Sequence, residues 1–270
     1  MPDISMEILS RFFQQHLPFC PTPRQVDGFK ADLSLVSPFL MEAALMEVRA
    51  GTRGYRVIHR PDEWRAAIFS VYNRKVAEHS QLFPIFHSFE IAFRSTVAVA
   101  LEAHYQHKRW WRAIYNELQR GGRAKNISTI GPVPIGHRAA WRIGQIMREI
   151  DGVDLSGTSI AGLNNGYEFM DCCDLNHAKQ LIEEHWSIFA PRFAPLTLND
   201  FSAKFDRVRE ARNKVYHHKS VARRTAVIAA AEELLDHLQF SLRFVYGKIN
   251  GCRPQAPTFS RAIEPRHRTR

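Results

Sequence analysis

The sequence predicts an all-α fold, and three observations lead to that prediction. Apolar residues recur at spacings of three and four in nearly every segment that shows a periodicity, as in amphipathic helices. No alternating pattern of useful length predicts a strand, and no internal repeat is present. The chain has 270 residues, 45% hydrophobic and 24% charged, so it can bury the core of one large domain or two small ones.

Residues 1–60 are expected to form an N-terminal helical extension. Apolar residues repeat with helical spacing over residues 6–17, and the prolines at 18, 21 and 23 would end that helix. A second helical stretch is expected over residues 26–48, interrupted near Pro38. The extension would therefore contribute several short helices ahead of the main domain.

Residues 61–250 are expected to form the main helical domain. Pro61, followed by two acidic residues, is typical of a helix start, and this helix would break near Pro84 and resume over residues 85–105. A loop-rich insertion is expected over residues 121–166, because nine of the chain's 14 glycines lie there. Within it, only residues 139–150 clearly predict a helix.

Regular helix is expected again after the insertion. Asp174 is a plausible N-cap for a helix whose apolar positions Leu175, Ala178, Ile182 and Trp186 fall on one face. Two further helices are expected over residues 199–218 and 220–246. Residues 251–270 hold five arginines and one glutamate among several prolines, and predict a basic, disordered tail.

Composition narrows the class of protein. With 37 Lys and Arg against 27 Asp and Glu, the net charge is +10, which favours an anionic partner, either nucleic acid or an anionic membrane surface. No run approaches the roughly 18 apolar residues that span a bilayer, and acidic residues near the start argue against a signal peptide. Four cysteines without CxxC spacing predict no disulfide scaffold, so a cytoplasmic protein without membrane contact is expected.

Several common sites are missing from the sequence. It contains no Walker A motif, no GxGxxG after a strand, no HExxH and no GxSxG. The loop that begins at Gly121 is not preceded by a strand, so it is interpreted as a plain loop. Cys172, Cys173, His177 and His185 match no zinc spacing and are interpreted as packing residues, so neither a metal nor a cofactor is expected.

The most informative segment is a basic stretch over residues 192–224, with nine Lys and Arg against three Asp and Glu. Within it, Arg212, Asn213, Lys214, His217 and His218 bring together permanent cations, an amide and two imidazoles. This grouping suits cleavage of an RNA phosphodiester, which needs a base for the 2′-OH, an acid for the leaving oxygen and a cation for the phosphate. Histidine can be base or acid, and arginine can bind phosphate oxygens.

Two interpretations of this segment remain open. Residues five apart on a helix lie about 140° apart around its axis, so Arg212 and His217 would not share one face. They would converge at a bent or frayed helix end, or across the two-fold axis of a dimer in which each copy supplies part of the site. The alternative is a solvated basic helix face carrying two surface histidines.

The arrangement Arg212-Asn213-x-x-x-His217 resembles the RNxxxH signature of HEPN domains, a helical family of ribonucleases and RNA-binding modules. Residues 173–193 followed by 201–219 resemble the HEPN succession of a helix that ends in a Trp, a linker and a helix carrying this signature. Residues 82–105, followed by Trp110 and Trp111, resemble the Abi-like defence proteins. The resemblance spans residues 64–246 except the insertion.

The resemblance implies a HEPN-like helical bundle and a metal-independent endoribonuclease of a bacterial defence (abortive infection) or toxin system. Such proteins act as homodimers on RNA, and an antitoxin or regulatory partner is possible. Arg212 and His217 would be catalytic, and Asn213 would orient the histidine or the phosphate. His218, Lys214 and Lys219 would bind RNA or support the site.

The sequence departs from the Abi-like pattern at three positions. Tyr216 and Lys219 stand where that family usually has alanine and glutamate, and Ser95 stands where it often has asparagine. These departures bear on substrate choice and on activity. A catalytically lapsed HEPN-type module that binds RNA or protein is therefore the alternative function, and a helical scaffold acting through its dimer surface is a third.

Glu90 and Arg94 are the candidate site residues on the upstream helix. Their spacing of four predicts an intrahelical ion pair, and the functional alternative is that Arg94 holds phosphate in the cleft. Trp110 and Trp111 are interpreted as core or helix-end anchors, with base stacking as the alternative.

Overall fold

The structure, a computed structural model, describes residues 22–33, 36–52, 64–152 and 160–242. The predicted all-α class is confirmed, because these residues are mostly helical. The expected helix over residues 6–17, the helix start at Pro61 and the tail over 251–270 lie outside the described residues. Within the described ranges, no helix has both the length and the apolar character needed to cross a bilayer.

The chain divides into two units, each described by itself. The described part of the first unit comprises residues 22–33, 36–52 and 64–83 together with residues 214–222. The described part of the second comprises residues 84–152, 160–213 and 223–242. The last three residues of the helix α11 (Leu198–Tyr216) are thus assigned to the first unit.

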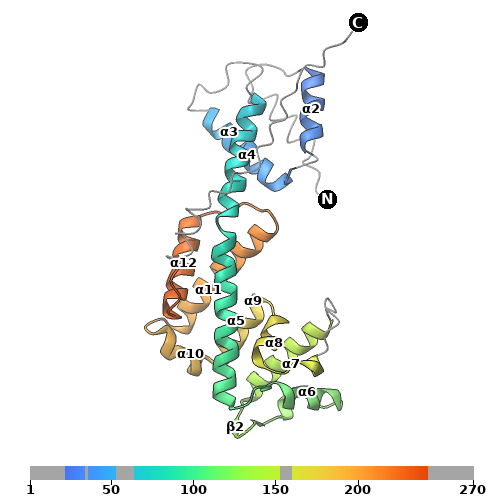
Figure 1. Cartoon of the computed structure of the whole chain (residues 1–270), viewed down its shortest axis with the longest axis vertical. Helices are drawn as coiled ribbons and strands as arrows, with labels where there is room; N and C mark the ends of the chain where they lie inside the picture. The colour runs from blue at the N-terminus through green and yellow to red at the C-terminus, as the bar shows by residue number, and fades with distance from the viewer. Residues whose placement is uncertain (1–21, 34–35, 53–63, 153–159, 243–270) are drawn as a thin grey trace. The chain divides into compact units, whose positions relative to one another are not determined.

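The first unit contains α2 (Pro23–Leu33), α3 (Pro38–Thr52) and α4 (Trp64–Ser80), labelled in Figure 1. The expected interruption near Pro38 is confirmed, since α3 begins at that residue. Pro23 is the first residue of α2. Proline suits a first helical position because its missing N–H would have no intrahelical acceptor there.

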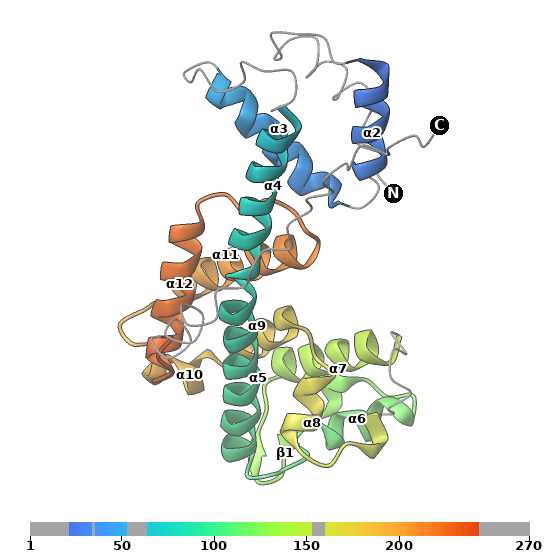
Figure 2. The same ribbon diagram turned by 45° about the horizontal axis from the view of Figure 1, so that its top comes forward.

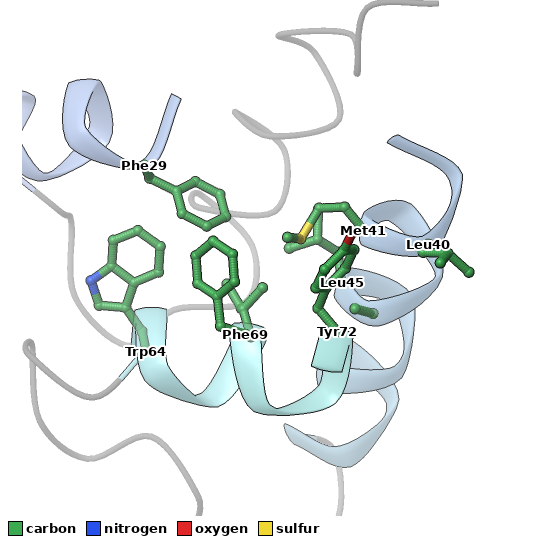
Figure 3. Close-up of a cluster of buried hydrophobic side chains, with 9 residues drawn as sticks. Phe29, Leu40, Met41, Leu45, Trp64, Phe69 and Tyr72 are labelled. Atoms are coloured by element: carbon green, nitrogen blue, oxygen red, sulfur yellow. The ribbon is translucent and has the colours of Figure 1, made fainter. Parts of the chain in front are cut away.

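The core of the first unit is an aromatic and aliphatic cluster, drawn in Figure 3. Phe29 of α2 lies between Trp64 and Phe69 of α4, with ring centroids 5.1 and 5.9 Å apart in edge-on geometry. The buried positions Trp64, Ile68 and Tyr72 recur every four residues, so they line one face of α4. The hydroxyl of Tyr72 accepts a hydrogen bond from the Ser37 N–H at 3.1 Å, just ahead of α3.

The second unit is built around α5 (Phe83–Tyr105), from Pro84 onward. Its other elements are α6 (Arg112–Gln119), η1 (Ala124–Asn126), β1 (Thr129–Ile130), β2 (Val133–Pro134), α7 (His137–Gly152), η2 (Ile160–Gly162), α8 (Gly166–Asp171), α9 (Leu175–Glu184), α10 (Trp186–Phe193), α11 (Leu198–Tyr216) and α12 (Arg224–His237). Within this unit, α10 and α12 lie on one side of α5, whereas α6, α7 and α8 lie on its other side (Figures 1 and 2).

Phenylalanine rings join α5 to α10 and α11. Phe93 lies 4.4 Å from Phe89, 5.0 Å from Phe205 and 6.0 Å from Phe193, measured between ring centroids. Phe201 lies 4.8 Å from Phe193. All five rings are fully buried or nearly so, and offset or edge-on aromatic pairs add to the free energy gained from burying the rings. This cluster fixes α11 against α5.

The observed elements differ from the predicted ones in detail. Asp174 is the N-cap of α9 as expected, and its carboxylate accepts from the His177 N–H at 2.7 Å. The helix expected to continue to Trp186 is interrupted at His185, which is the C-cap of α9 and the N-cap of α10. The insertion also contains a short antiparallel hairpin, β1 with β2, because Gly131 turns the chain with a φ of +54°.

The last two helices are shorter than expected. α11 ends at Tyr216 rather than at 218, and α12 covers Arg224–His237 rather than 220–246. Residues 243–246 lie outside the described residues. Arg223, immediately before α12, has a φ of +53°, and this left-handed residue delays the start of the helix.

A second buried cluster packs the end of α5. Trp110 and Trp111 are fully buried, with Phe169 at 5.0 and 4.8 Å from their ring centroids, so the structure places both tryptophans in the core. Next to them, Tyr105 and His185 share a hydrogen bond of 2.7 Å between Oη and Nε2. Both residues are buried, and burial raises the pKa of Tyr105, which keeps its hydroxyl protonated as a donor.

The ring of His185 is held in its neutral form. Its Nδ1 lies 2.9 Å from the Leu181 carbonyl oxygen, so Nδ1 carries the proton and Nε2 accepts from Tyr105. Burial lowers the pKa of His185 from 6.5 to about 4, an effect that the hydrogen bond to Leu181 partly opposes.

This buried histidine predicts a loss of stability in acid. Below pH 6.5 the unfolded chain takes up a proton that the folded chain does not accept until about pH 4. The contribution, about 3 kcal/mol, is complete above pH 6.5 and declines as the pH falls to 4. Urea unfolding at pH 7.5 and 4.5 should show a smaller acid loss for His185→Gln than for the unmodified chain.

The exposed residue His137 provides the matched control for that measurement. His137→Gln should lose as much stability in acid as the unmodified chain, because its side chain stays in solvent. Equal acid losses for His185→Gln and the unmodified chain would contradict the assignment.

Candidate functional site

Four of the predicted site residues come together in the second unit: Glu90 and Arg94 of α5, and Arg212 and Asn213 of α11. α11 buries Phe201, Phe205, Val208 and Ala211, which recur at spacings of three and four. Arg212 follows Val208 by four residues and Phe205 by seven, so it lies in line with this stripe, on the face of α11 that packs against α5. We call these four residues the Glu90 cluster.

Glu90 is the centre of the Glu90 cluster. Its two carboxylate oxygens accept from the Arg212 guanidinium, at 3.2 Å from Nε and at 3.0 and 3.3 Å from the terminal nitrogen Nη2. Oε1 of Glu90 also accepts from Arg94 at 2.6 Å. The intrahelical pair expected from the sequence is therefore confirmed, and it is part of a larger cluster that joins two helices 122 residues apart.

Asn213 completes the Glu90 cluster. Its Oδ1 accepts a hydrogen bond of 3.2 Å from Nη1 of Arg212, so amide and carboxylate together orient the guanidinium. Paired hydrogen bonds of this kind fix the orientation of the planar guanidinium of an arginine. The ammonium of a lysine is not planar and could not be oriented as strictly.

The Glu90 cluster carries a net positive charge of one, from two guanidiniums and one carboxylate. The Glu90 side chain is only 11% exposed, while those of Arg94 and Arg212 are 25% and 26% exposed. The carboxylate thus lies beneath two partly exposed cations. Such a surface can attract an anion, because the buried negative charge is already neutralised.

Arg94 also faces the junction of α8 and α9. Its charge partly opposes the effect of burial, which raises the pKa of both Cys172 and Cys173. Cys173 is almost completely buried, so its thiol stays protonated at neutral pH. The two cysteines therefore pack beside the Glu90 cluster without supplying a nucleophile.

No group of three or more His, Cys, Asp or Glu side chains suited to a metal ion occurs among the described residues. The Nε2 of His177 lies 2.9 Å from a carboxylate oxygen of Glu149, and its Nδ1 accepts from the Asp174 N–H at the start of α9. His185 contacts Tyr105 and Leu181 instead. The cysteines at 172 and 173 and the histidines at 177 and 185 therefore do not share one site.

The other predicted site residues, Lys214, His217, His218 and Lys219, are exposed and belong to the first unit. The Lys219 N–H donates to the Lys214 carbonyl at 2.7 Å, and the His218 N–H to that of Val215 at 2.9 Å. These two bonds form a Schellman motif, the common closure of a helix C-terminus. His217 is therefore the C-cap residue of α11 and lies outside the helix.

His218 occupies the position of this motif that normally holds glycine. Its φ is +54°, in the left-handed region. Its carbonyl accepts from the hydroxyl of Ser37 at 3.4 Å, and the next residue, Lys219, places Nζ 5.4 Å from the centroid of the Phe39 ring. The backbone at His218 and the side chain of Lys219 thus help pack this segment within the first unit.

Comparison of the chain with protein-family models, with curated proteins and with solved structures finds no match.

The Glu90 cluster predicts a large cost for removing its carboxylate charge. Glu90→Gln would leave two guanidiniums facing each other across a poorly solvated site, and should lower the free energy of unfolding by about 2 to 4 kcal/mol. Urea unfolding measures the change. The double variant Glu90→Gln/Arg212→Gln should lose less than the sum of its single variants, because the two residues interact directly.

The control is Glu233→Gln, which removes a carboxylate from a half-exposed pair with Lys204 in the same unit. That change should cost below about 1 kcal/mol. If Glu90→Gln costs no more than Glu233→Gln, the Glu90 cluster does not stabilise the helix pair.

The left-handed residue His218 makes a separate prediction. His218→Gly should raise the free energy of unfolding by about 0.5 to 1 kcal/mol, because glycine adopts this conformation without steric cost. His217→Gly, one position earlier and without a positive φ, should lower it by a similar amount. Thermal unfolding of both variants tests the pair, and a loss of stability for His218→Gly would contradict the motif.

Proposed function

We propose that the chain is a metal-independent endoribonuclease with a HEPN-like fold, acting in a bacterial defence (abortive infection) or toxin system. The observation that carries the proposal is the Glu90 cluster. Two helices far apart in sequence join Arg212 and Asn213, which the resemblance selects, to Glu90 and Arg94, the candidate site residues of the upstream helix. Packing alone does not require two partly exposed guanidiniums above one buried carboxylate.

Each residue has a distinct chemical role in this proposal. Arg212 stabilises the charge that develops on the phosphate, and Asn213 orients its guanidinium or the phosphate. His217 transfers the protons, taking one from the 2′-OH or giving one to the leaving 5′-oxygen. Glu90 is a positioning residue that fixes Arg212, and Arg94 adds a second cation.

The reaction needs both a base and an acid, whereas one copy offers a single histidine at the RNxxxH position. We therefore propose that two copies form a homodimer, so that each contributes an Arg212 and a His217 to a shared site. Lys214, His218 and Lys219, all exposed, would contact the RNA around this site. Toxic activity would call for an antitoxin or regulatory partner in the cytoplasm.

A catalytically lapsed module that binds RNA or protein is the second candidate. The observation in its favour is that Glu90 already engages both Nε and Nη2 of Arg212. A guanidinium held in this way can serve structure alone, and Tyr216 and Lys219 depart from the Abi-like pattern that the sequence resembles. In that case Arg212 would matter for folding and not for chemistry.

The proposal predicts that His217→Ala abolishes RNA cleavage while leaving folding and RNA binding nearly unchanged. Loss of a general acid or base typically lowers the rate by about 10²- to 10⁴-fold. The control is His218→Gly, which removes the adjacent imidazole and suits the left-handed backbone. Because His218 is proposed to contact RNA and not to transfer protons, this variant should weaken RNA binding but keep the cleavage rate at saturating RNA. Full activity of His217→Ala would refute the assignment, and strong inhibition by EDTA would favour a metal nuclease instead.

The products separate the two candidate functions. Attack by the 2′-OH leaves a 2′,3′-cyclic phosphate on the 5′ fragment, so these ends support the enzyme. Binding of RNA without any cleavage, by the unmodified chain and by His217→Ala alike, supports the lapsed module.

A further inference from the structure

We propose that the exposed face of α7 binds single-stranded RNA, with Trp141 stacking on a base and Arg138, Arg142 and Arg148 contacting the phosphates. This helix lies in the glycine-rich insertion, which the resemblance leaves unmatched. The choice of RNA among single-stranded nucleic acids rests on the proposed function. The binding face itself is inferred from the side chains of α7.

The packing of α7 determines which face is exposed. Ala140, Ile143 and Met147 are buried, and Gly144 lies so close to η1 that a Cβ on it would be 2.6 Å from Cβ of Ala124. The helix is therefore held firmly against α6 and η1. Arg138, Trp141, Gln145 and Arg148 recur at spacings of three and four along the other side, over about 15 Å of helix.

Trp141 is the unusual member of this face. It is 46% exposed, whereas Trp64, Trp110 and Trp111 are buried. The Arg142 guanidinium lies 5.0 Å from the Trp141 ring centroid, and its Nη1 donates to Gln145 at 2.8 Å. An exposed indole beside a fixed guanidinium forms a platform on which a base can stack while its phosphate meets a cation.

The charge around α7 complements a nucleic acid. Residues 106–152 contain nine Lys and Arg against three Asp and Glu, a net charge of +6 out of +10 for the whole chain. Two carboxylates contact this face or its edge: Glu184 lies 2.9 Å from Arg138 and 3.9 Å from Arg142, and Glu149 lies 2.9 Å from His177. The Arg138 side chain nevertheless remains 83% exposed.

The same observations disfavour other occupants. A second copy would set one strongly basic region against another, which costs free energy. A bilayer or a protein hot spot would require several neighbouring apolar side chains, but Trp141 is the only large apolar side chain exposed among the described side chains of α7. An isolated aromatic residue among arginines suits a stacked base and its phosphates.

The test uses the full chain and a fluorescein-labelled 12-residue 2′-O-methyl oligouridine, which cannot be cleaved by 2′-OH attack. Fluorescence anisotropy at low salt should show binding that Trp141→Ala weakens about 5- to 100-fold, because a base–aromatic stack is lost. Trp141→Phe should retain most of the affinity. The matched control is Tyr167→Ala, which removes an aromatic residue of equal exposure, 47%, from α8 and should bind normally.

A salt titration tests the arginines. Replacing Arg138 and Arg148 together by glutamine should reduce the slope of log K against log salt by about 1.4, since each phosphate contact on a single strand contributes about 0.7. An unchanged slope would show that these two arginines do not contact the phosphates.

Equal affinity for Trp141→Ala and the unmodified chain, or no binding by the unmodified chain, would overturn the inference. These results are independent of cleavage, which is measured separately with an unmodified RNA and His217→Ala. If cleavage depends on His217 but binding does not depend on Trp141, only the proposed binding face on α7 is refuted. The reverse result refutes only the ribonuclease.

Discussion

The second unit depends on how one carboxylate is neutralised. Glu90 is almost buried, and an isolated carboxylate in that position would cost several kcal/mol in lost hydration. Arg94 comes from the next turn of the same helix, but it leaves one carboxylate oxygen to be satisfied from elsewhere. Arg212 supplies the remaining donors from α11. The pairing and the phenylalanine cluster therefore together specify which turn of α11 faces α5.

This constraint bears directly on the proposed chemistry. A guanidinium whose Nε and Nη2 engage Glu90 cannot offer those same donors to a phosphate without giving up the carboxylate. Phosphate binding must therefore use Nη1, held beside Asn213, or compete with Glu90. In either case the buried carboxylate sets the orientation of the Arg212 guanidinium and how tightly that guanidinium can bind a phosphate. Both the structural role and the proposed catalytic role of Arg212 thus depend on its pairing with Glu90.

The sequence predicts what is determined locally. Helical periodicity, the Asp174 cap and the Glu90–Arg94 spacing each involve a few neighbouring residues, and the structure contains all of them. The Glu90–Arg212 pair spans 122 positions, and no local pattern states which helices will pack together. The end of α11 was misplaced because histidine occupies the left-handed position that glycine usually marks. A tryptophan on the polar side of an amphipathic helix was the available sign of the exposed face of α7.

The glycine-rich insertion is integrated into the second unit through α9. Glu184 of α9 pairs with Arg138 of α7, and His177 of α9 contacts Glu149 near the other end of that helix. On its other side, Lys179 of α9 pairs with Asp206 of α11, at 2.8 Å. α9 therefore holds α7 and α11 at two sets of contacts. A ligand on α7 would be bound to the same framework that carries Arg212, so the proposed binding face needs no hinge to stay in register with the Glu90 cluster.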